Sequence, residues 1–316
     1  MTTLPDSRHF TLERLADGVW AAVHSVGGWA VGNAGIVDLG DVTLLFDTCL
    51  TDSAARALER AAVALTGRAP GLVALSHYHN DHVRGAEVFA AATVVASTVT
   101  RTLLRGPGHE ELASDRSHGV AQLERARAFT RDADPHKRAF ARYFVPYWEG
   151  LVASAPRASV RLPDVTFDGA VHFHGSRRSA TLASYGAAHS GDDAVLVLEE
   201  DGVVFCGDLL FNACHPYLAD GDPEGWLAAL DRVANTGATR FVPGHGSVGT
   251  LDDVHALQAH IQGLMATAER LHRGGHELDD LAEPMPDDAS ADWTFTYPFY
   301  GANLRFLVGR MGGDRR

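Results

Sequence analysis

The sequence predicts an α/β protein with a four-layer αββα sandwich, in which two packed sheets lie between outer helices. Three observations predict it. Strand-like and helix-like segments follow a strand–helix–strand order that occurs twice. A histidine-rich run begins where the first of these units ends. The composition, with 46% hydrophobic and 21% charged residues over 316 residues, is typical of a globular protein with a sizeable core.

The first half opens with apolar segments that are separated by glycines, as strands joined by tight turns would be. A helix with Thr51 or Asp52 available as its N-cap follows, and a short, fully apolar strand comes next. The expected strands are 18–24, 29–39, 42–47 and 72–75, and the helix is 51–66.

The second half repeats this order and ends with a long helix. Its strands are expected at 194–198, 203–206 and 241–243, and its helices at 223–234 and 251–272. Two similar halves of this kind would place their loops along one edge of the sandwich. We therefore expect residues 1–316 to form a single domain.

Residues 107–156 separate the halves and have helical character, so they are predicted to be a helical insertion within the domain. Two interpretations stay open. The segment is either a surface elaboration or a lid over the functional site, because long insertions in enzymes often cover active sites. Its aromatic residues would either line a substrate cavity or pack onto the sheet; they are Phe140, Tyr143, Phe144, Tyr147 and Trp148.

The overall charge and the apolar segments exclude several partners. A formal net charge of −13 disfavours binding to nucleic acid. No segment reaches the ~20 apolar residues that a membrane helix needs, and the first residues do not resemble a signal peptide, so we expect a cytoplasmic protein. The three cysteines, Cys49, Cys206 and Cys214, have no C-x-x-C spacing and are expected to be buried apolar residues. A small molecule remains as the expected partner, and the oligomeric state is unknown.

The run from His77 to His82, with the sequence HYHNDH, is the strongest chemical signal. Residues two apart in an extended segment point to the same side, so His77 and His79 can offer imidazoles to one metal ion. Asp81 and His82 follow near the start of a helix and can face a second ion. A histidine-rich surface loop is the alternative, but four ligand-type residues at the end of an apolar strand favour a metal site, and zinc suits these ligands.

This run resembles the H-x-H-x-D-H motif of the metallo-β-lactamase superfamily. Three further motifs are similar to those of the family and occur in the same order: His189 in AHSGD, Asp208 in VVFCGD and His245 in VPGHG. The resemblance extends from the opening strands to about Gly249. It implies the metallo-β-lactamase fold and a metal centre with ligands from both halves of the chain.

The resemblance also implies how the ligands are shared between two zinc ions. His77, His79 and His189 would hold one ion, Asp81, His82 and His245 would hold the other, and Asp208 would bridge them. Two ions ~3.5–4 Å apart can share a hydroxide that attacks a carbonyl group. Asp81 would orient this nucleophile or pass its proton to the leaving group, so Asp81 and Asp208 are expected to be catalytic as well as ligands.

His79 separates two branches of the family. The corresponding residue of the diiron, oxygen-reducing branch is typically a glutamate, whose harder oxygen ligand suits redox iron. A histidine at this position favours zinc and hydrolysis.

Other residues near these motifs are candidates for supporting roles. Asp47 is either a carboxylate that supports the metal ligands or an ordinary strand-end residue. Tyr217 and His215 could reach the substrate, and Tyr217 is a candidate catalytic donor to a developing oxyanion. Candidates for the cleft, with weaker support, are Trp29, Asn33, Tyr297, Tyr300 and Asn303.

The predicted function is that of a dinuclear zinc-dependent hydrolase acting on a small ester, lactone, thioester or amide. Two alternatives remain. The chain has some similarity to bacterial polyketide cyclase-like members of the family, in its GGW…NAG opening and its GDLLF run, and these would use the metals for ring closure. A metal-binding protein without turnover is the other alternative.

Overall fold

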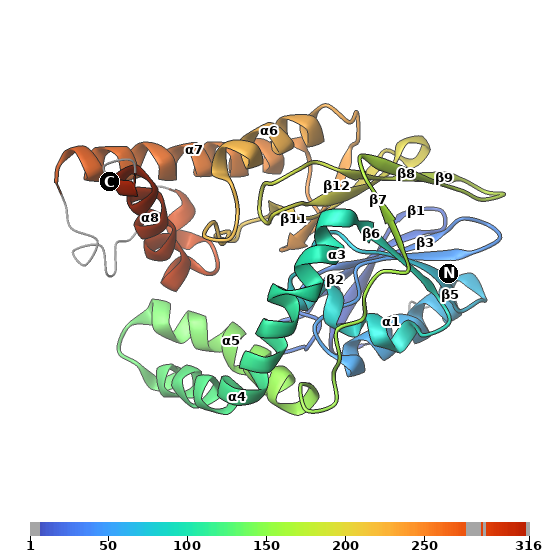
Figure 1. Ribbon diagram of the computed structural model, residues 1–316, viewed down its shortest axis with the longest axis horizontal. Coiled ribbons are helices and arrows are strands. Elements are labelled where there is room, and N and C mark those ends of the chain that lie inside the picture. The colour runs from blue at the N-terminus through green and yellow to red at the C-terminus, as the bar shows by residue number, and fades with distance from the viewer. Residues whose placement is uncertain (1–6, 276–285, 287–288, 314–316) are drawn as a thin grey trace.

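Two sheets packed face to face form the centre of the computed structural model, which describes residues 7–275, 286 and 289–313. Helices α6 (Pro223–Ala234) and α7 (Leu251–Arg273) cover the outer face of one sheet, and α1 (Asp52–Thr66) covers the outer face of the other (Figure 1). The four-layer αββα prediction is therefore confirmed.

The larger sheet has seven strands, which lie in the order in which they occur along the chain. The strands are β1 (Phe10–Ala16), β2 (Val19–His24), β3 (Ala34–Asp38), β4 (Thr43–Phe46), β5 (Pro70–Ala74), β6 (Thr93–Ser97) and β7 (Val165–Phe167). The first four strands pair antiparallel, and pairing is parallel from β4 to β7. The parallel part places the ends of β4 and β5 side by side, where the histidine-rich run begins.

The smaller sheet has five strands in the reverse of the chain order. They are β12 (Arg240–His245), β11 (Val203–Phe211), β10 (Ala194–Leu198), β9 (Ser179–Ser184) and β8 (Ala170–His174). Within this smaller sheet, β11 and β12 pair in parallel, and the other neighbouring strands pair antiparallel. Strand β11 is longer than the predicted 203–206 because it continues through the polar residue Asp208, and all nine of its residues are buried.

Each half contains one strand–helix–strand unit with parallel strands, as predicted. In the first half α1 connects β4 to β5, and in the second half α6 connects β11 to β12. Thr51 caps α1 by accepting a hydrogen bond from the Ala54 amide, and Asp222 caps α6 by accepting one from the Gly225 amide. The two units bring the carboxyl ends of β4, β5, β11 and β12 to one edge of the sandwich.

The core between the sheets is filled by apolar side chains from both. Phe46 of β4 and Phe205 of β11 pack with their ring centroids 5.8 Å apart. Gly35 leaves room for this contact, because a Cβ atom there would lie 2.6 Å from the Phe205 ring. The close approach of the two sheets fixes the distance between the loops at their edge.

The predicted strand 29–39 begins only at Ala34. The preceding residues form a loop, in which Val31 has a φ of 65° and its amide donates to Nδ1 of His24. Sequence patterns also missed several elements, namely β1, β6 to β9, α3 (Thr98–Arg105) and α8 (Thr296–Gly313). Most of these are short strands or lie at the ends of the domain, where the apolar pattern is weak.

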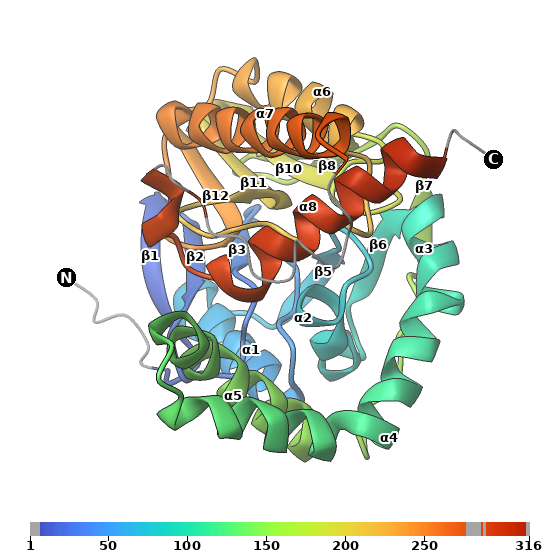
Figure 2. The same ribbon diagram turned by 90° about the vertical axis from the view of Figure 1, so that its left-hand side faces the viewer.

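Two helices, α4 (Pro107–Ala128) and α5 (Pro135–Ser154), account for most of the helical segment predicted at 107–156. They pack against each other and extend to the same end of the molecule as α8 (Figures 1 and 2). Aromatic rings of α5 contact rings of the carboxy-terminal segment, among them Tyr143 with Phe295 and Phe144 with Phe299. That this pair of helices is a lid stays a prediction.

Two further expectations concern the cysteines and the membrane. Cys49, Cys206 and Cys214 are buried and unpaired, as predicted. Among the residues that the structure describes, no helix combines the length and apolar character needed to cross a bilayer.

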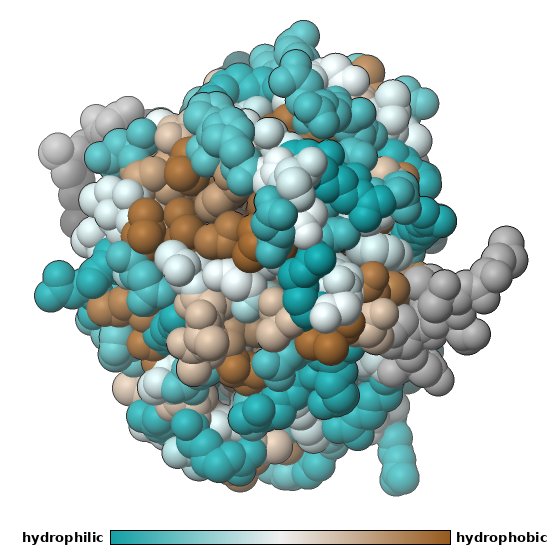
Figure 3. Space-filling model, turned by 90° about the vertical axis from the view of Figure 1, so that its right-hand side faces the viewer, coloured by the Kyte–Doolittle hydropathy of each residue, from teal (hydrophilic) through white to brown (hydrophobic). Residues whose placement is uncertain are grey.

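At the end of the molecule opposite to α5 and α8, hydrophobic residues form several separate groups among hydrophilic ones (Figure 3).

Candidate metal centre

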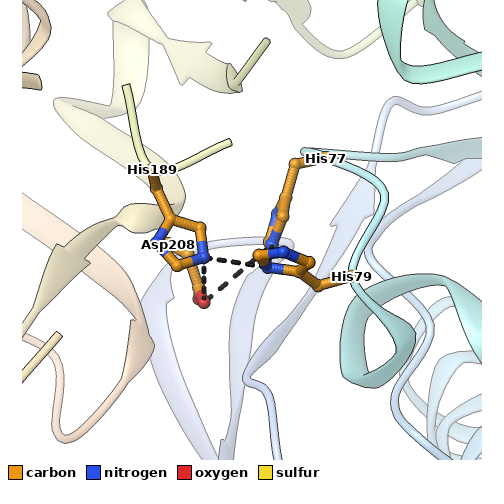
Figure 4. A group of neighbouring side chains, drawn as sticks. All are labelled: His77, His79, His189 and Asp208. Atoms are coloured by element: carbon orange, nitrogen blue, oxygen red, sulfur yellow. Dashed lines mark hydrogen bonds and ion pairs between the residues drawn. The ribbon is translucent and has the colours of Figure 1, made fainter. Parts of the chain in front are cut away.

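All seven side chains that the motifs single out meet at one edge of the sandwich. They fall into two groups, and the possible ligand atoms within each group lie within 4.8 Å of one another. The first group is His77, His79, His189 and Asp208, and the second is Asp81, His82 and His245. The first group draws its side chains from both halves of the chain, and they point toward one another (Figure 4).

The first group places three imidazole nitrogens around a common point. Nδ1 of His79 lies 3.0 Å from Nε2 of His77 and 2.9 Å from Nε2 of His189. Three nitrogens this close are unfavourable unless a proton or a cation lies between them. Three imidazole nitrogens in this arrangement are typical of a zinc site.

Asp208 faces both groups. Its Oδ2 atom lies 3.2 Å from Nε2 of His189 and 3.4 Å from Nε2 of His245, and its Oδ1 atom lies 3.0 Å from Nε2 of His82. Oδ2 of Asp81 lies 3.3 Å from the same nitrogen of His245. One carboxylate therefore reaches histidines of both groups, which is the arrangement that a bridging ligand requires.

Asp47 supports two of these histidines from beneath. It has a left-handed backbone with a φ of 60°, and its Oδ2 atom lies 2.8 Å from Nδ1 of His82. The Ser76 hydroxyl also donates to this atom, at 2.8 Å, and is itself 2.9 Å from Nδ1 of His77. These contacts direct Nε2 of both histidines into the cluster. Of the two roles considered for Asp47, the structure therefore favours a carboxylate that supports the metal ligands over an ordinary strand-end residue.

A second supporting carboxylate, Asp220, was not singled out in the sequence. Its Oδ2 atom lies 2.9 Å from Nε2 of His79, and the Tyr78 hydroxyl donates to the same oxygen. Nε2 of His79 is thus occupied, and Nδ1 remains to face the cluster. Asp220 lies in a loop 141 residues away in the chain, so no local pattern identifies it.

The electrostatics of the cluster match those of a site that holds cations. Burial lowers the pKa of His77 well below its ordinary value and that of His189 to about 3, so both imidazoles are neutral, as metal ligands must be. Burial opposes ionisation of Asp208, but His82 and His245 hold its pKa well below the ordinary range. Nε2 of His82 and Oδ1 of Asp208 are buried and face each other as an ion pair at 3.0 Å, without the geometry of a hydrogen bond. The donor set therefore fits metal ions, which would satisfy these atoms.

Comparison with known proteins agrees with this geometry. The family model of the metallo-β-lactamase superfamily matches residues 27–245, which include every member of the two groups. The chain belongs to the metallo-β-lactamase superfamily. Among solved structures, a metallo-β-lactamase from Pontibacter korlensis is similar in fold, with a TM-score of 0.57 and 18% sequence identity over 80% of this chain and 99% of that one.

A cavity of about 290 Å³ lies in front of the two groups. The loop after β11 contributes Tyr217, which is 39% exposed, and α4 contributes Glu111. Sequence patterns did not indicate Glu111, nor two phenylalanines, Phe295 just before α8 and Phe299 within it. The aromatic residues of α5 that line the cavity are Phe144 and Tyr147.

Several weaker candidates lie outside the residues that line this cavity. His215 is buried, with Nε2 2.8 Å from the Ser290 carbonyl, and its ring packs against Tyr300. The Asn303 side chain bonds the backbone of Leu218 and Pro216. His215, which the sequence offered as one of two residues that could reach the substrate, does not line the cavity, because the chain folds it into the core beneath α8.

Three other cleft candidates also lie elsewhere. Asn33 donates to the carbonyls of Pro243 and Gly246 and so anchors the loop that carries His245. The ring of Tyr297 packs on Phe140 instead of lining the cavity, and the Trp29 ring packs near His9.

A substitution at Gly244 tests whether zinc binding depends on the position of the Asp208 carboxylate. A Cβ atom at Gly244 would lie 1.8 Å from Oδ1 of Asp208, so Gly244→Ala must displace that carboxylate. We expect a loss of zinc affinity of at least about tenfold, measured by competition with a chromogenic chelator. Gly263→Ala in α7 is the matched control, since nothing lies within 4 Å of a Cβ atom there. Equal zinc affinity in both variants would contradict this role for Asp208.

Zinc binding to the second group is expected to release protons. Burial favours the neutral form of both histidines, but Asp208 is the main cause that raises the pKa of His245 to about 9 and that of His82 well above its ordinary value. Without metal His245 is protonated at pH 7 and the protonated form of His82 is favoured, so zinc must displace protons from both, and the His245 contribution makes affinity rise with pH up to about 9. Calorimetry in buffers with different ionisation enthalpies measures this release, and a heat that does not depend on the buffer would contradict it.

Proposed function

We propose that this protein is a dinuclear zinc-dependent hydrolase that cleaves a small ester, lactone, thioester or amide. The observation that carries the proposal is the position of Asp208, with one oxygen next to His82 and the other next to His189 and His245. A structural zinc site has a closed set of ligands around one ion and does not require a carboxylate that is shared between two groups of ligands. The open cavity in front of both groups also supports a catalytic site.

In this proposal His77, His79 and His189 hold one ion, Asp81, His82 and His245 hold the other, and Asp208 contacts both. When bound, the two ions would supply a water of lowered pKa as nucleophile and would polarise the carbonyl group of the substrate. The buried carboxylate of Asp47 and the half-exposed carboxylate of Asp220 keep the imidazoles of His82 and His79 in the orientation that binding needs.

Two side chains have proposed roles in proton transfer and charge stabilisation. Asp81 borders the cavity and is 12% exposed at its side chain, so it can orient the attacking water and carry its proton to the leaving group. Burial raises the pKa of Tyr217, which keeps its hydroxyl protonated at neutral pH. Tyr217 is therefore available as a hydrogen-bond donor to the developing oxyanion.

A second candidate is metal-assisted ring closure of an aromatic precursor, as in the polyketide cyclase-like relatives. The aromatic lining of the cavity favours it, because flat rings would stack there. The mass of the product separates the two reactions, since hydrolysis adds the elements of water to the substrate and ring closure does not.

The test is a panel of esters, lactones, thioesters and amides with zinc-loaded protein, in parallel with His79→Ala and Asp208→Ala. We expect at least one substrate to be hydrolysed, and both variants to lose at least about 100-fold in kcat/KM. Two bound metal ions without turnover of any substrate would favour a metal-binding protein. Activity that is unchanged in both variants would place the catalytic site elsewhere.

A further inference from the structure

The outer walls of the cavity are aromatic. Besides Phe211, whose ring packs against His189 and His245, five aromatic side chains border it, and we call these the aromatic wall: Phe144, Tyr147, Tyr217, Phe295 and Phe299. Their rings contact one another, with centroids 5.8 Å apart for Phe144 and Phe295, and 5.6 Å apart for Tyr217 and Phe299. The Asn80 side chain donates to the Tyr147 hydroxyl at 3.0 Å and fixes that ring beside the metal ligands. A continuous surface of this kind favours a flat apolar group.

Apart from histidines of the two ligand groups, the cavity offers no basic side chain to a ligand. Among the described residues that line it there is neither a lysine nor an arginine, whereas Glu111 adds a carboxylate that is not part of the two ligand groups. Arg84 lies 3.6 Å from Glu111 and 3.0 Å from Asp115, and it does not line this cavity. Its guanidinium is thus buried and held by these two carboxylates, and it is not presented to a substrate.

A further carboxylate lies close to the cavity. The side chain of Asp220 is 38% exposed and contacts His79, which does line the cavity. Any anionic group on a substrate would have to leave water for a surface of aromatic rings flanked by Glu111 and Asp220. Away from the metal ions such a charge would have no cationic partner, so its desolvation is costly, and the repulsion of like charges adds to that cost.

These observations define a substrate class. Granted the hydrolase function proposed above, we infer that the site takes uncharged substrates that carry an aromatic or similarly flat apolar group beside the carbonyl carbon, and that it discriminates against substrates with an anion at that position. Recognition is by aromatic contact, and exclusion is by Glu111. Glu111 is therefore a specificity-determining residue of the site.

A pair of esters of closely similar shape tests the inference. 4-Nitrophenyl 3-(methylsulfonyl)benzoate is uncharged, and 4-nitrophenyl 3-sulfobenzoate differs from it mainly in a negative charge that is a poor ligand for zinc. We expect kcat/KM for the uncharged ester to be at least about tenfold higher. Equal values for the two esters, or a higher value for the sulfonate, would overturn the inference.

Burial raises the pKa of Glu111 to about 7, although Arg84 opposes the shift, so the two esters are compared at a pH well above 7, where the carboxylate is ionised. Glu111→Gln then removes the charge and keeps the size of the side chain. We expect the ratio of the two kcat/KM values to fall at least about threefold in this variant, because its cavity repels the sulfonate less. The matched control is Glu110→Gln, at a neighbouring exposed position of α4. A ratio that is the same in wild type and Glu111→Gln would contradict the role given to Glu111.

Binding without turnover separates this inference from the proposed function. The corresponding N-methylbenzamides, with a methylsulfonyl or a sulfonate group, are titrated into the zinc-loaded protein and followed by saturation-transfer NMR. Preferential binding of the uncharged amide, with neither ester hydrolysed, would support the substrate class and refute the hydrolase. Hydrolysis of both esters at equal rates would support the hydrolase and refute the substrate class. Binding of neither amide, or equal binding of both, would overturn the inference.

Discussion

Replacing Asp208 with Asn is expected to abolish one of the two metal sites. The amide keeps the shape of the carboxylate but loses its charge, and it would face three histidine nitrogens at 3.0, 3.2 and 3.4 Å. Without the carboxylate, two cations in adjacent groups would repel each other with no shared counter-charge. We expect zinc content to fall from two ions to about one per chain and kcat/KM to fall by about 10²–10³-fold, measured by elemental analysis and ester hydrolysis.

The control for this variant is Asp168→Asn, at an exposed position outside the cavity. Circular dichroism of both variants with a chelator present shows whether the fold survives without metal. If Asp208→Asn keeps two tightly bound ions, Asp208 is not shared between them, and the proposed arrangement of ligands is wrong.

Among the substitutions proposed for this protein, Trp226→Ala is expected to give the largest loss of stability. Trp226 of α6 is fully buried, and its indole N–H donates to the Leu209 carbonyl of β11 at 2.9 Å. Its ring also packs against His189, with centroids 5.0 Å apart. We expect the free energy of unfolding to fall by about 3–5 kcal/mol, measured by urea denaturation of the metal-free protein.

Trp226→Phe separates packing from hydrogen bonding at this position. It fills most of the cavity but leaves the Leu209 carbonyl without its partner, so we expect a loss of about 1–3 kcal/mol. Zinc affinity should fall in Trp226→Ala because His189 loses the ring that supports it. A loss below about 1 kcal/mol in Trp226→Ala would show that α6 contributes little to the stability of the domain.

The layers of the fold could be predicted because both strand–helix–strand units have strong apolar patterns. The helix expected at 223–234 is α6 with the same bounds, and the strand at 194–198 is β10. The apolar pattern did not predict the end of a strand correctly where a polar residue is buried within the sheet. Strand β11 continues through Asp208, because a buried polar ligand interrupts the apolar run without ending the strand. The strand expected from residue 29 fails because Val31 has a left-handed backbone.

Local spacing identified His77, His79, Asp81 and His82. The other three members of the two ligand groups, His189, Asp208 and His245, came from the resemblance to the family. The residues that surround them come from distant segments. Asp220 reaches His79 from the loop before α6, and Glu111 reaches the cavity from the insertion. Phe295 and Phe299 belong to the carboxy-terminal segment, whose position depends on packing against α5. A single sequence carries no signal for such contacts, and these are the residues that we expect to select the substrate.

The most direct test of the central claim is an anomalous difference map from a crystal of the zinc-loaded protein, with data collected on both sides of the zinc absorption edge. We predict two peaks, one beside His77, His79 and His189 and one beside Asp81, His82 and His245, with Asp208 in contact with both. A single peak, or two peaks of which only one touches Asp208, would contradict a dinuclear centre bridged by this carboxylate.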